Sequence, residues 1–152
     1  MITCSSLEEI EALRGQPPAL SGWRAITQSD IDRFADLTGD HQWIHVDPAR
    51  AARESPFGGT IVHGFLTLAM TARLFNDAIT LENRKSGLNY GFDKLRFVTP
   101  VPAGAKVRAG FQLAEAQRIA PGTLQCGWDV QIEAEGAARP AIAARWLTRV
   151  NY

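Results

Sequence analysis

The C-terminal part of the chain alternates between apolar and polar residues with a period of two. From Thr123 to Glu133 every second residue, Leu124 through Ile132, is apolar. Such alternation is typical of a β-strand with one buried face. Further strands are expected over residues 88–98, 107–113 and 142–150, with proline and glycine turns between them. Consecutive strands with short connections predict an antiparallel sheet that runs as a meander.

The apolar pattern is helical from Gly64 onward. Apolar residues between Phe65 and Ile79 fall nearly all the way round a helix, so we expect this helix to be buried along most of its surface. A sheet with one apolar face needs a second layer, and this is the only long apolar element available. The sequence therefore predicts an α+β fold in which an antiparallel β-sheet wraps around a long central α-helix.

The first 25 residues are expected to form a short helix and a linker. Ser5 or Ser6, followed by two glutamates, resembles a capping arrangement, and the helical pattern stops at Gly15. A short strand or edge segment is expected over residues 23–26.

Two more helices are expected before the central one. Thr27 with Asp30 resembles a capping box, and the helix that follows ends at Gly39. Asp47 followed by a proline is a helix start, which predicts a short helix over residues 48–54.

Composition places the chain among single-domain proteins. A length of 152 residues predicts one domain over residues 1–152. Sixteen basic and sixteen acidic residues give a net charge of zero, which argues against nucleic acid or an anionic membrane surface as a partner. The N-terminus has no apolar signal-peptide core, so we expect a cytoplasmic protein. Cys4 and Cys126 fit neither a disulfide framework nor a zinc spacing, and reduced thiols are expected.

Candidate chemistry is concentrated between Gly39 and Met70. All three histidines (His41, His45 and His63) lie in this stretch, together with Asp40. An aspartate after a glycine often bonds nearby amides, and a lone histidine is more often buried against a carbonyl than catalytic. A carboxylate and an imidazole presented together from irregular backbone can, however, move a proton to or from water or a carbon acid.

These residues resemble the MaoC-like dehydratases, the (R)-specific enoyl-CoA hydratase family of hot-dog proteins, and within them the branch that includes nodulation protein N. The family signature is an aspartate, a histidine five positions later, and an Ile-Val-His-Gly segment that opens the central helix. Asp40, His45 and residues 61–64 match it in order. The spacer departs from the family at Gln42 and Trp43, where many members have Asn-Pro.

The resemblance implies a function and a role for each matched residue. Asp40 and His45 would activate water for reversible hydration of a trans-2-enoyl-CoA to the (R)-3-hydroxyacyl-CoA, and either could be the base. Gly64 would donate its amide to the thioester oxygen at the positive end of the helix. Acyl-CoA is then the substrate and no cofactor is needed.

The remaining candidates have weaker assignments. Gln42, Trp43 and His63 are candidate pocket residues. Packing against the neighbouring helix is the alternative for Trp43, and His63 is expected to cap or orient the start of the central helix. The three histidines could hold zinc, but their spacing matches no zinc motif, so we expect no metal. The basic residues expected near the coenzyme A phosphates are Arg84, Lys85, Lys94 and Arg96, for which a solvated face is the alternative interpretation.

Two other functions remain open at this stage. A hot-dog acyl-CoA thioesterase would typically carry an acid along the central helix, where this chain has none before Asp77. A non-catalytic module that binds acyl thioesters would not need both Asp40 and His45, the two residues of the candidate catalytic dyad. A homodimer is also expected, because the meander leaves an edge strand that a second subunit can cover.

Overall fold

The computed structural model describes residues 1–152. Its helices are α1 (Leu7–Glu11), α2 (Gln28–Thr38), α3 (Trp43–Val46), α4 (Pro48–Glu54) and α5 (Gly64–Ala78). Its strands are β1 (Ile2–Cys4), β2 (Ala19–Leu20), β3 (Arg24–Ala25), β4 (Ile79–Leu81), β5 (Ser86–Phe97), β6 (Lys106–Ala120), β7 (Thr123–Ala134) and β8 (Ile142–Asn151).

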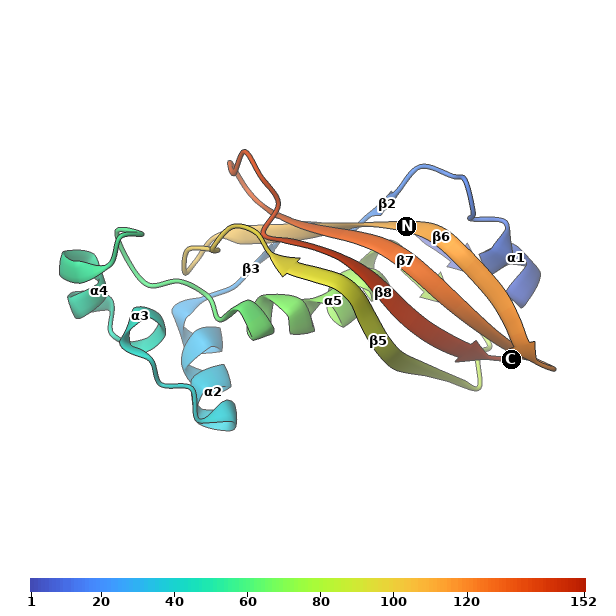
Figure 1. The fold of residues 1–152 in the computed structure, drawn as a ribbon, viewed down its shortest axis with the longest axis horizontal. Coiled ribbons are helices and arrows are strands. Elements are labelled where there is room, and N and C mark those ends of the chain that lie inside the picture. Colours follow the sequence, from blue (N-terminus) through green and yellow to red (C-terminus); the bar gives the residue numbers. More distant parts are fainter.

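The long strands form one antiparallel sheet that curves over α5 (Figure 1). The sheet has the order β2-β6-β7-β8-β5, with β3 also paired to β6. This arrangement confirms the α+β hot-dog fold, with a sheet around a central helix. The helices α2, α3 and α4 extend beyond one end of the sheet, at the end where α5 begins (Figure 1).

The predicted meander is wrong at one strand. Only β6, β7 and β8 follow one another across the sheet, whereas β5 pairs with β8 and forms the far edge. The connection from β5 to β6 therefore crosses the sheet instead of making a hairpin. Alternation of apolar residues identifies a strand but does not fix its neighbour.

The core forms where α5 meets the concave face of the sheet. The ring of Phe75 on α5 makes edge-on contacts with three aromatic rings of the sheet, Phe111, Trp128 and Trp146, at centroid distances of 5.2, 5.1 and 5.3 Å. Edge-on aromatic pairs are each worth roughly 0.5–1.5 kcal/mol beyond the area they bury. These contacts fix α5 against the sheet and so place its N-terminus.

The central helix is less buried than its composition predicts. Its buried residues form one stripe, which includes Thr67, Leu74 and Phe75, while Phe65 at its start is 67% exposed. The prediction of burial along most of the helix is wrong for the single chain, because the sheet covers one side only.

The first strands were not predicted from the sequence. β1 pairs in parallel with β4 immediately after the central helix, which buries Cys4. The two-residue strand β2 joins the edge of β6. Strands this short carry too few residues to show an alternating pattern. The strand expected over residues 23–26 is present as β3, Arg24–Ala25.

Candidate active site

Asp40 is positioned by the end of α2. The helix begins with the predicted capping box, in which Thr27 and Asp30 bond each other's backbone amides. It ends at Gly39, whose φ of 78° lies in the left-handed region that glycine adopts at little cost. The chain reverses there and carries Asp40 out of the helix at a defined position, with its side chain exposed to solvent.

His45 lies on the short helix α3, where the sequence predicted irregular backbone. It is 7% exposed, and its Nδ1 is 2.7 Å from the carbonyl oxygen of Ile61. Because a carbonyl only accepts, Nδ1 carries the hydrogen and Nε2 is left with a free lone pair. Ile61 also donates its backbone amide to the carbonyl of Ile44 at 3.0 Å, so the histidine is anchored to the segment before α5.

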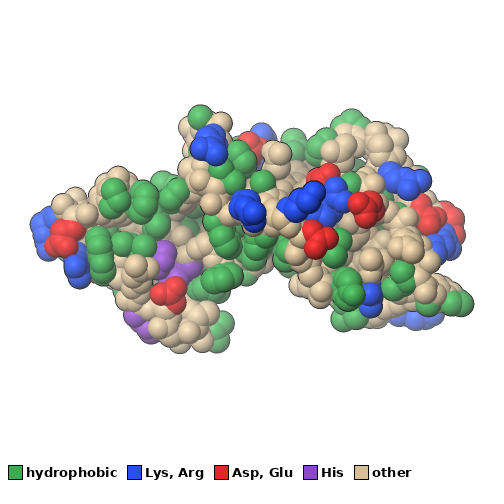
Figure 2. Space-filling view, viewed as in Figure 1, with side chains coloured by type: hydrophobic (Ala, Val, Ile, Leu, Met, Phe, Trp, Pro, Cys, Tyr) green, Lys and Arg blue, Asp and Glu red, His purple; other side chains and the backbone are tan.

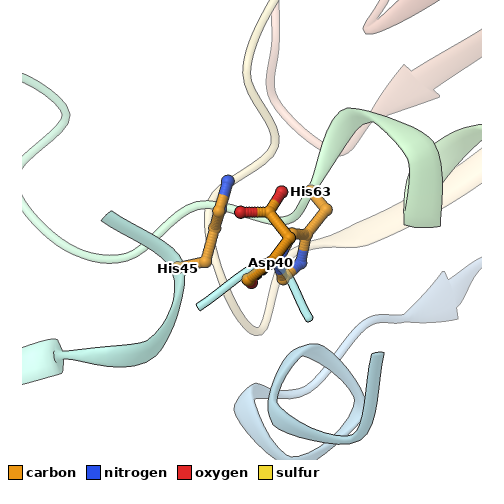
Figure 3. Close-up of side chains that lie close together, drawn as sticks. All are labelled: Asp40, His45 and His63. Carbon is orange, nitrogen blue, oxygen red and sulfur yellow. Dashed lines mark hydrogen bonds between the residues drawn. The ribbon is translucent and has the colours of Figure 1, made fainter. Parts of the chain in front are cut away.

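Asp40, His45 and His63 come together from three segments of the chain (Figure 3). One ligand-type atom from each lies within 4.8 Å of the other two. The carboxylate of Asp40 and the ring of His45 make no direct hydrogen bond. One water bonded to both groups would separate their heavy atoms by roughly 4.5 Å, so the spacing suits a shared water.

The environment of His45 favours its neutral form. Burial lowers the pKa of His45 below its ordinary value, and His63 lowers it further, against the opposing effects of the Ile61 carbonyl and Asp40. A neutral imidazole with a bare Nε2 accepts protons, as a general base must.

Gly64 opens α5 beside this cluster. His45, Gly64, Thr67 and Phe97 line one cavity of about 180 Å³. The first amides of a helix have no acceptor within the helix, and the helix dipole makes this end positive. The amide of Gly64 is therefore placed where an anionic oxygen in the cavity would be stabilised.

Phe97 also lines this cavity, a role that was not predicted from the sequence. Its ring lies against Gly64 and makes an edge-on contact with Phe65 at a centroid distance of 5.7 Å. The position of Phe97 at the end of a strand pattern does not predict this contact, because the contact depends on how β5 ends over α5.

The other predicted pocket residues, Gln42, Trp43 and His63, do not line this cavity, and neither does His41. Gln42 is exposed and makes no side-chain cap at the start of α3, and Trp43 is half-buried with the guanidinium of Arg50 4.4 Å above its ring. His41 is exposed and bonds Asp36 at 3.0 Å. In Figure 2 the histidine side chains gather at the end of the molecule that holds the helical extension.

The basic residues proposed for the phosphates also lie elsewhere. None of Arg84, Lys85, Lys94 and Arg96 lines the cavity of His45 and Gly64. Arg84 lines a separate cavity beside Trp146, and Lys85 bonds the carbonyl of the last residue at 3.0 Å.

Asp40, His45 and His63 carry atoms that could bind a metal ion, but the arrangement of the two histidine rings does not suit metal binding. The rings of His45 and His63 stack face to face, with centroids 3.9 Å apart and an interplanar angle of 26°. Ring lone pairs lie in the ring planes, so stacked rings direct them side by side and not toward one point. That the site works without a metal stays a prediction.

A family model and several curated proteins match most of this chain. Residues 9–127 match the model of the family described as MaoC like domain. The chain is 45% identical over 149 residues to 3-hydroxyacyl-thioester dehydratase Z of Mycobacterium tuberculosis, covering 98% of both chains. It is 44% identical over 148 residues to nodulation protein N of Rhizobium leguminosarum bv. viciae, covering 97% of this chain and 92% of that protein.

A solved structure shares the fold. The unliganded R-hydratase PhaJ1 from Pseudomonas aeruginosa superimposes with a TM-score of 0.71 at 22% identity, covering 94% of this chain and 83% of the other. At this identity the likeness bears on the fold alone.

Proposed function

The chain belongs to the MaoC-like domain family, and from this membership and the geometry of the site we propose that it catalyses the reversible, (R)-specific hydration of a trans-2-enoyl thioester of coenzyme A. The observation that carries the proposal is the close approach of Asp40 and His45, whose polar side-chain atoms lie within 4.8 Å of each other, with Gly64 and His45 in one cavity.

The proposed reaction uses His45 as the base. Nε2 of His45 takes a proton from the water as the water oxygen bonds carbon 3 of the substrate. The electron pair of the carbon–carbon double bond moves to the thioester oxygen. When this enolate collapses, carbon 2 takes the proton back from His45, so that water is added and nothing else is consumed.

Asp40 and Gly64 have supporting parts in this scheme. The carboxylate of Asp40 accepts the second hydrogen of the water and stabilises the imidazolium that forms on His45. The amide of Gly64 donates to the thioester oxygen as its negative charge develops, which is where fixed donors contribute most to rate.

The thioesterase alternative lacks its acid. The only acid on α5 is Asp77, near its C-terminal end, and its carboxylate is held by Arg24 at 2.8 Å. An acid bound to arginine far from Gly64 cannot serve chemistry at the helix start. A binding module without catalysis would not require a base buried with a lowered pKa.

The experiment that separates these functions uses crotonyl-CoA and the purified protein. Loss of the enoyl absorbance without release of thiol is the expected result. Release of free thiol would indicate a thioesterase, and tight binding with neither change would indicate a binding module. Repeating the assay with the same acyl group on acyl-carrier protein would show which thioester is preferred.

We also propose that the protein acts as a homodimer. The edge strand β5 is paired on one side only, and exposed apolar residues on it and at the start of α5 include Phe65, Leu88, Tyr90 and Phe97. Soluble proteins normally cover such an edge and such a patch. A second copy joined at β5 would continue the sheet and bring cover to the exposed side of α5.

No helix in the structure combines the length and the apolar composition required to cross a membrane. A cytoplasmic location remains our proposal.

A further inference from the structure

His63 is buried against both members of the proposed dyad. It is 2% exposed, and its Nε2 is 2.9 Å from the main-chain carbonyl oxygen of Asp40, to which it donates. One face of its ring stacks on His45, and its ring centroid lies 5.1 Å from that of Phe34 on α2. No other side chain contacts Asp40 by a hydrogen bond and His45 by stacking at the same time.

Packing alone does not explain an imidazole at this position. His63 occupies the N-cap position of α5, but its side chain makes no capping hydrogen bond, and orienting the helix start stays a prediction. Its Nδ1 is fully buried and makes no hydrogen bond. A buried polar atom without a partner lowers stability and calls for an explanation, and an apolar ring would fill the same space without one.

The two dyad members differ in how well they are held without His63. His45 is already tied to Ile61 at 2.7 Å. Asp40 is exposed, and its backbone amide has only a long 3.4 Å bond to the hydroxyl of Thr38. The bond from His63 is therefore the shorter of these two hydrogen bonds to the backbone of Asp40.

We propose that His63 is a positioning residue that holds Asp40 against His45 so that the two share one water. This rests on the proposed hydratase function. The donor to Asp40 is the more important contact, and the ring stack holds the face of His45 in place.

Two substitutions separate these contacts. His63→Gln keeps a donor of similar reach but loses the ring, and His63→Phe keeps a flat ring but loses the donor. We expect the turnover number to fall at least about tenfold in His63→Phe, with KM little changed, because only positioning for the chemical step is lost. His63→Gln should recover part of that loss.

Stability and coupling distinguish positioning from a structural role. His63→Phe removes the unpartnered Nδ1 as well as the bond to the Asp40 carbonyl, two effects of opposite sign, so its Tm should stay close to that of the native protein while its rate falls. In an Asp40→Asn background the two His63 variants should have the same rate within about twofold, since the carboxylate they position is gone. The control is Thr71→Val on α5. It removes the Thr71 hydroxyl, the other buried side-chain atom without a hydrogen-bond partner, and should leave the rate unchanged.

An NMR measurement tests the proposal without substrate. In His63→Phe the backbone of residues 39–41 should show larger fast-timescale motion than in His63→Gln or the native protein. Equal order in all three proteins would overturn the positioning role even if the enzyme is a hydratase. If the native protein does not hydrate enoyl thioesters, the proposed function fails while this measurement still decides the role of the contact. Full turnover in His63→Phe would also reject the positioning role. So would a double variant of His63→Phe and Asp40→Asn whose loss of turnover equals the product of the two single losses.

Discussion

The ring of Phe97 lies so close to the backbone of Gly64 that a Cβ atom added to Gly64 would stand 3.0 Å from its Cδ1. This close approach favours glycine at the start of α5 for steric reasons, since no left-handed backbone angle is involved. We expect Gly64→Ala to lower turnover at least about tenfold, because the added methyl group would occupy the place of the thioester beside the Gly64 amide.

The same substitution should not unfold the protein. Phe97 is 49% exposed, so its ring can move outward, and alanine is favoured over glycine in a helix by up to about 1 kcal/mol. Steady-state kinetics with a parallel thermal melt would test this. A large drop in Tm, or an unchanged turnover number, would contradict the place given to Gly64.

Phe97 itself is expected to act on substrate binding. Phe97→Ala would remove an apolar wall of the cavity that His45 lines, so we expect KM for an enoyl thioester to rise about tenfold while the turnover number changes less. Phe97→Leu is the matched control, because it keeps an apolar wall and should show a smaller rise. Equal KM values in both variants and the native protein would show that the ring does not touch the substrate.

The sequence predicted those elements that have local signals. The capping box of Thr27 and Asp30, the stop at Gly39 and the start at Pro48 are all present, because each depends on residues within one turn of helix. The place of β5 at the sheet edge was not predictable, since it depends on contacts far apart in the chain.

The candidate site shows the same division. The motif places Asp40, His45 and Gly64 in order along the chain. In the structure Asp40 lies close to His45, and His45 lines one cavity with Gly64, although Asp40 does not line that cavity. The bond from His63 to the carbonyl of Asp40 and the contact of Phe97 with Gly64 have no counterpart in residue spacing. Both depend on how separate segments fold over one another.

Substitutions of the dyad should be strongly non-additive. Asp40→Asn keeps shape but loses the charge, and His45→Gln keeps a polar group but cannot cycle a proton. Each should lower turnover by roughly a hundredfold or more, and the double variant should lose far less than the product of the two. Single-turnover kinetics on the four proteins would measure this.

The matched control for the dyad is His41→Gln. His41 is exposed and bonds Asp36 away from the cavity, so its loss should leave turnover within about a few fold. A loss as large as that of His45→Gln would mean that the dyad has been assigned to the wrong histidine.

The pH dependence of kcat/KM should report the buried state of His45. Burial holds its pKa below the ordinary value of about 6.5, and His63 and Asp40 are the charged or titratable groups that face it. Since the base must be neutral, activity should be retained as pH falls to 6.5 and be lost only at lower pH.

The stability of the folded protein should depend on pH in the same direction as the activity, through the same histidine, His45. A histidine with a lowered pKa in the folded state contributes most above the pKa of the unfolded chain, and this contribution falls as pH drops below about 6.5. A pH–rate profile with an acid limb above 6.5 would contradict the assignment of His45 as the buried base. The His41→Gln variant should leave that limb in place.

The final prediction concerns the free edge of β5. In the native protein, sedimentation at micromolar concentration should show twice the mass of one chain, because the exposed apolar residues near this edge need cover. Leu88 lies on β5 and is 58% exposed, so Leu88→Glu would place a charge in the interface and should yield monomers. Ile119→Glu is the control, since Ile119 is 40% exposed at the far end of β6 and should leave the dimer intact.

Activity should follow assembly in the same pair of variants. Asp40 is open to solvent in the single chain, whereas a proton-transfer site works best when bulk water is excluded. If the second subunit supplies that cover, Leu88→Glu should lose turnover in step with its loss of dimer, and raising the protein concentration should restore both. Ile119→Glu should keep both at every concentration. A native protein that sediments as a monomer with full hydratase activity would show that one chain is a complete enzyme.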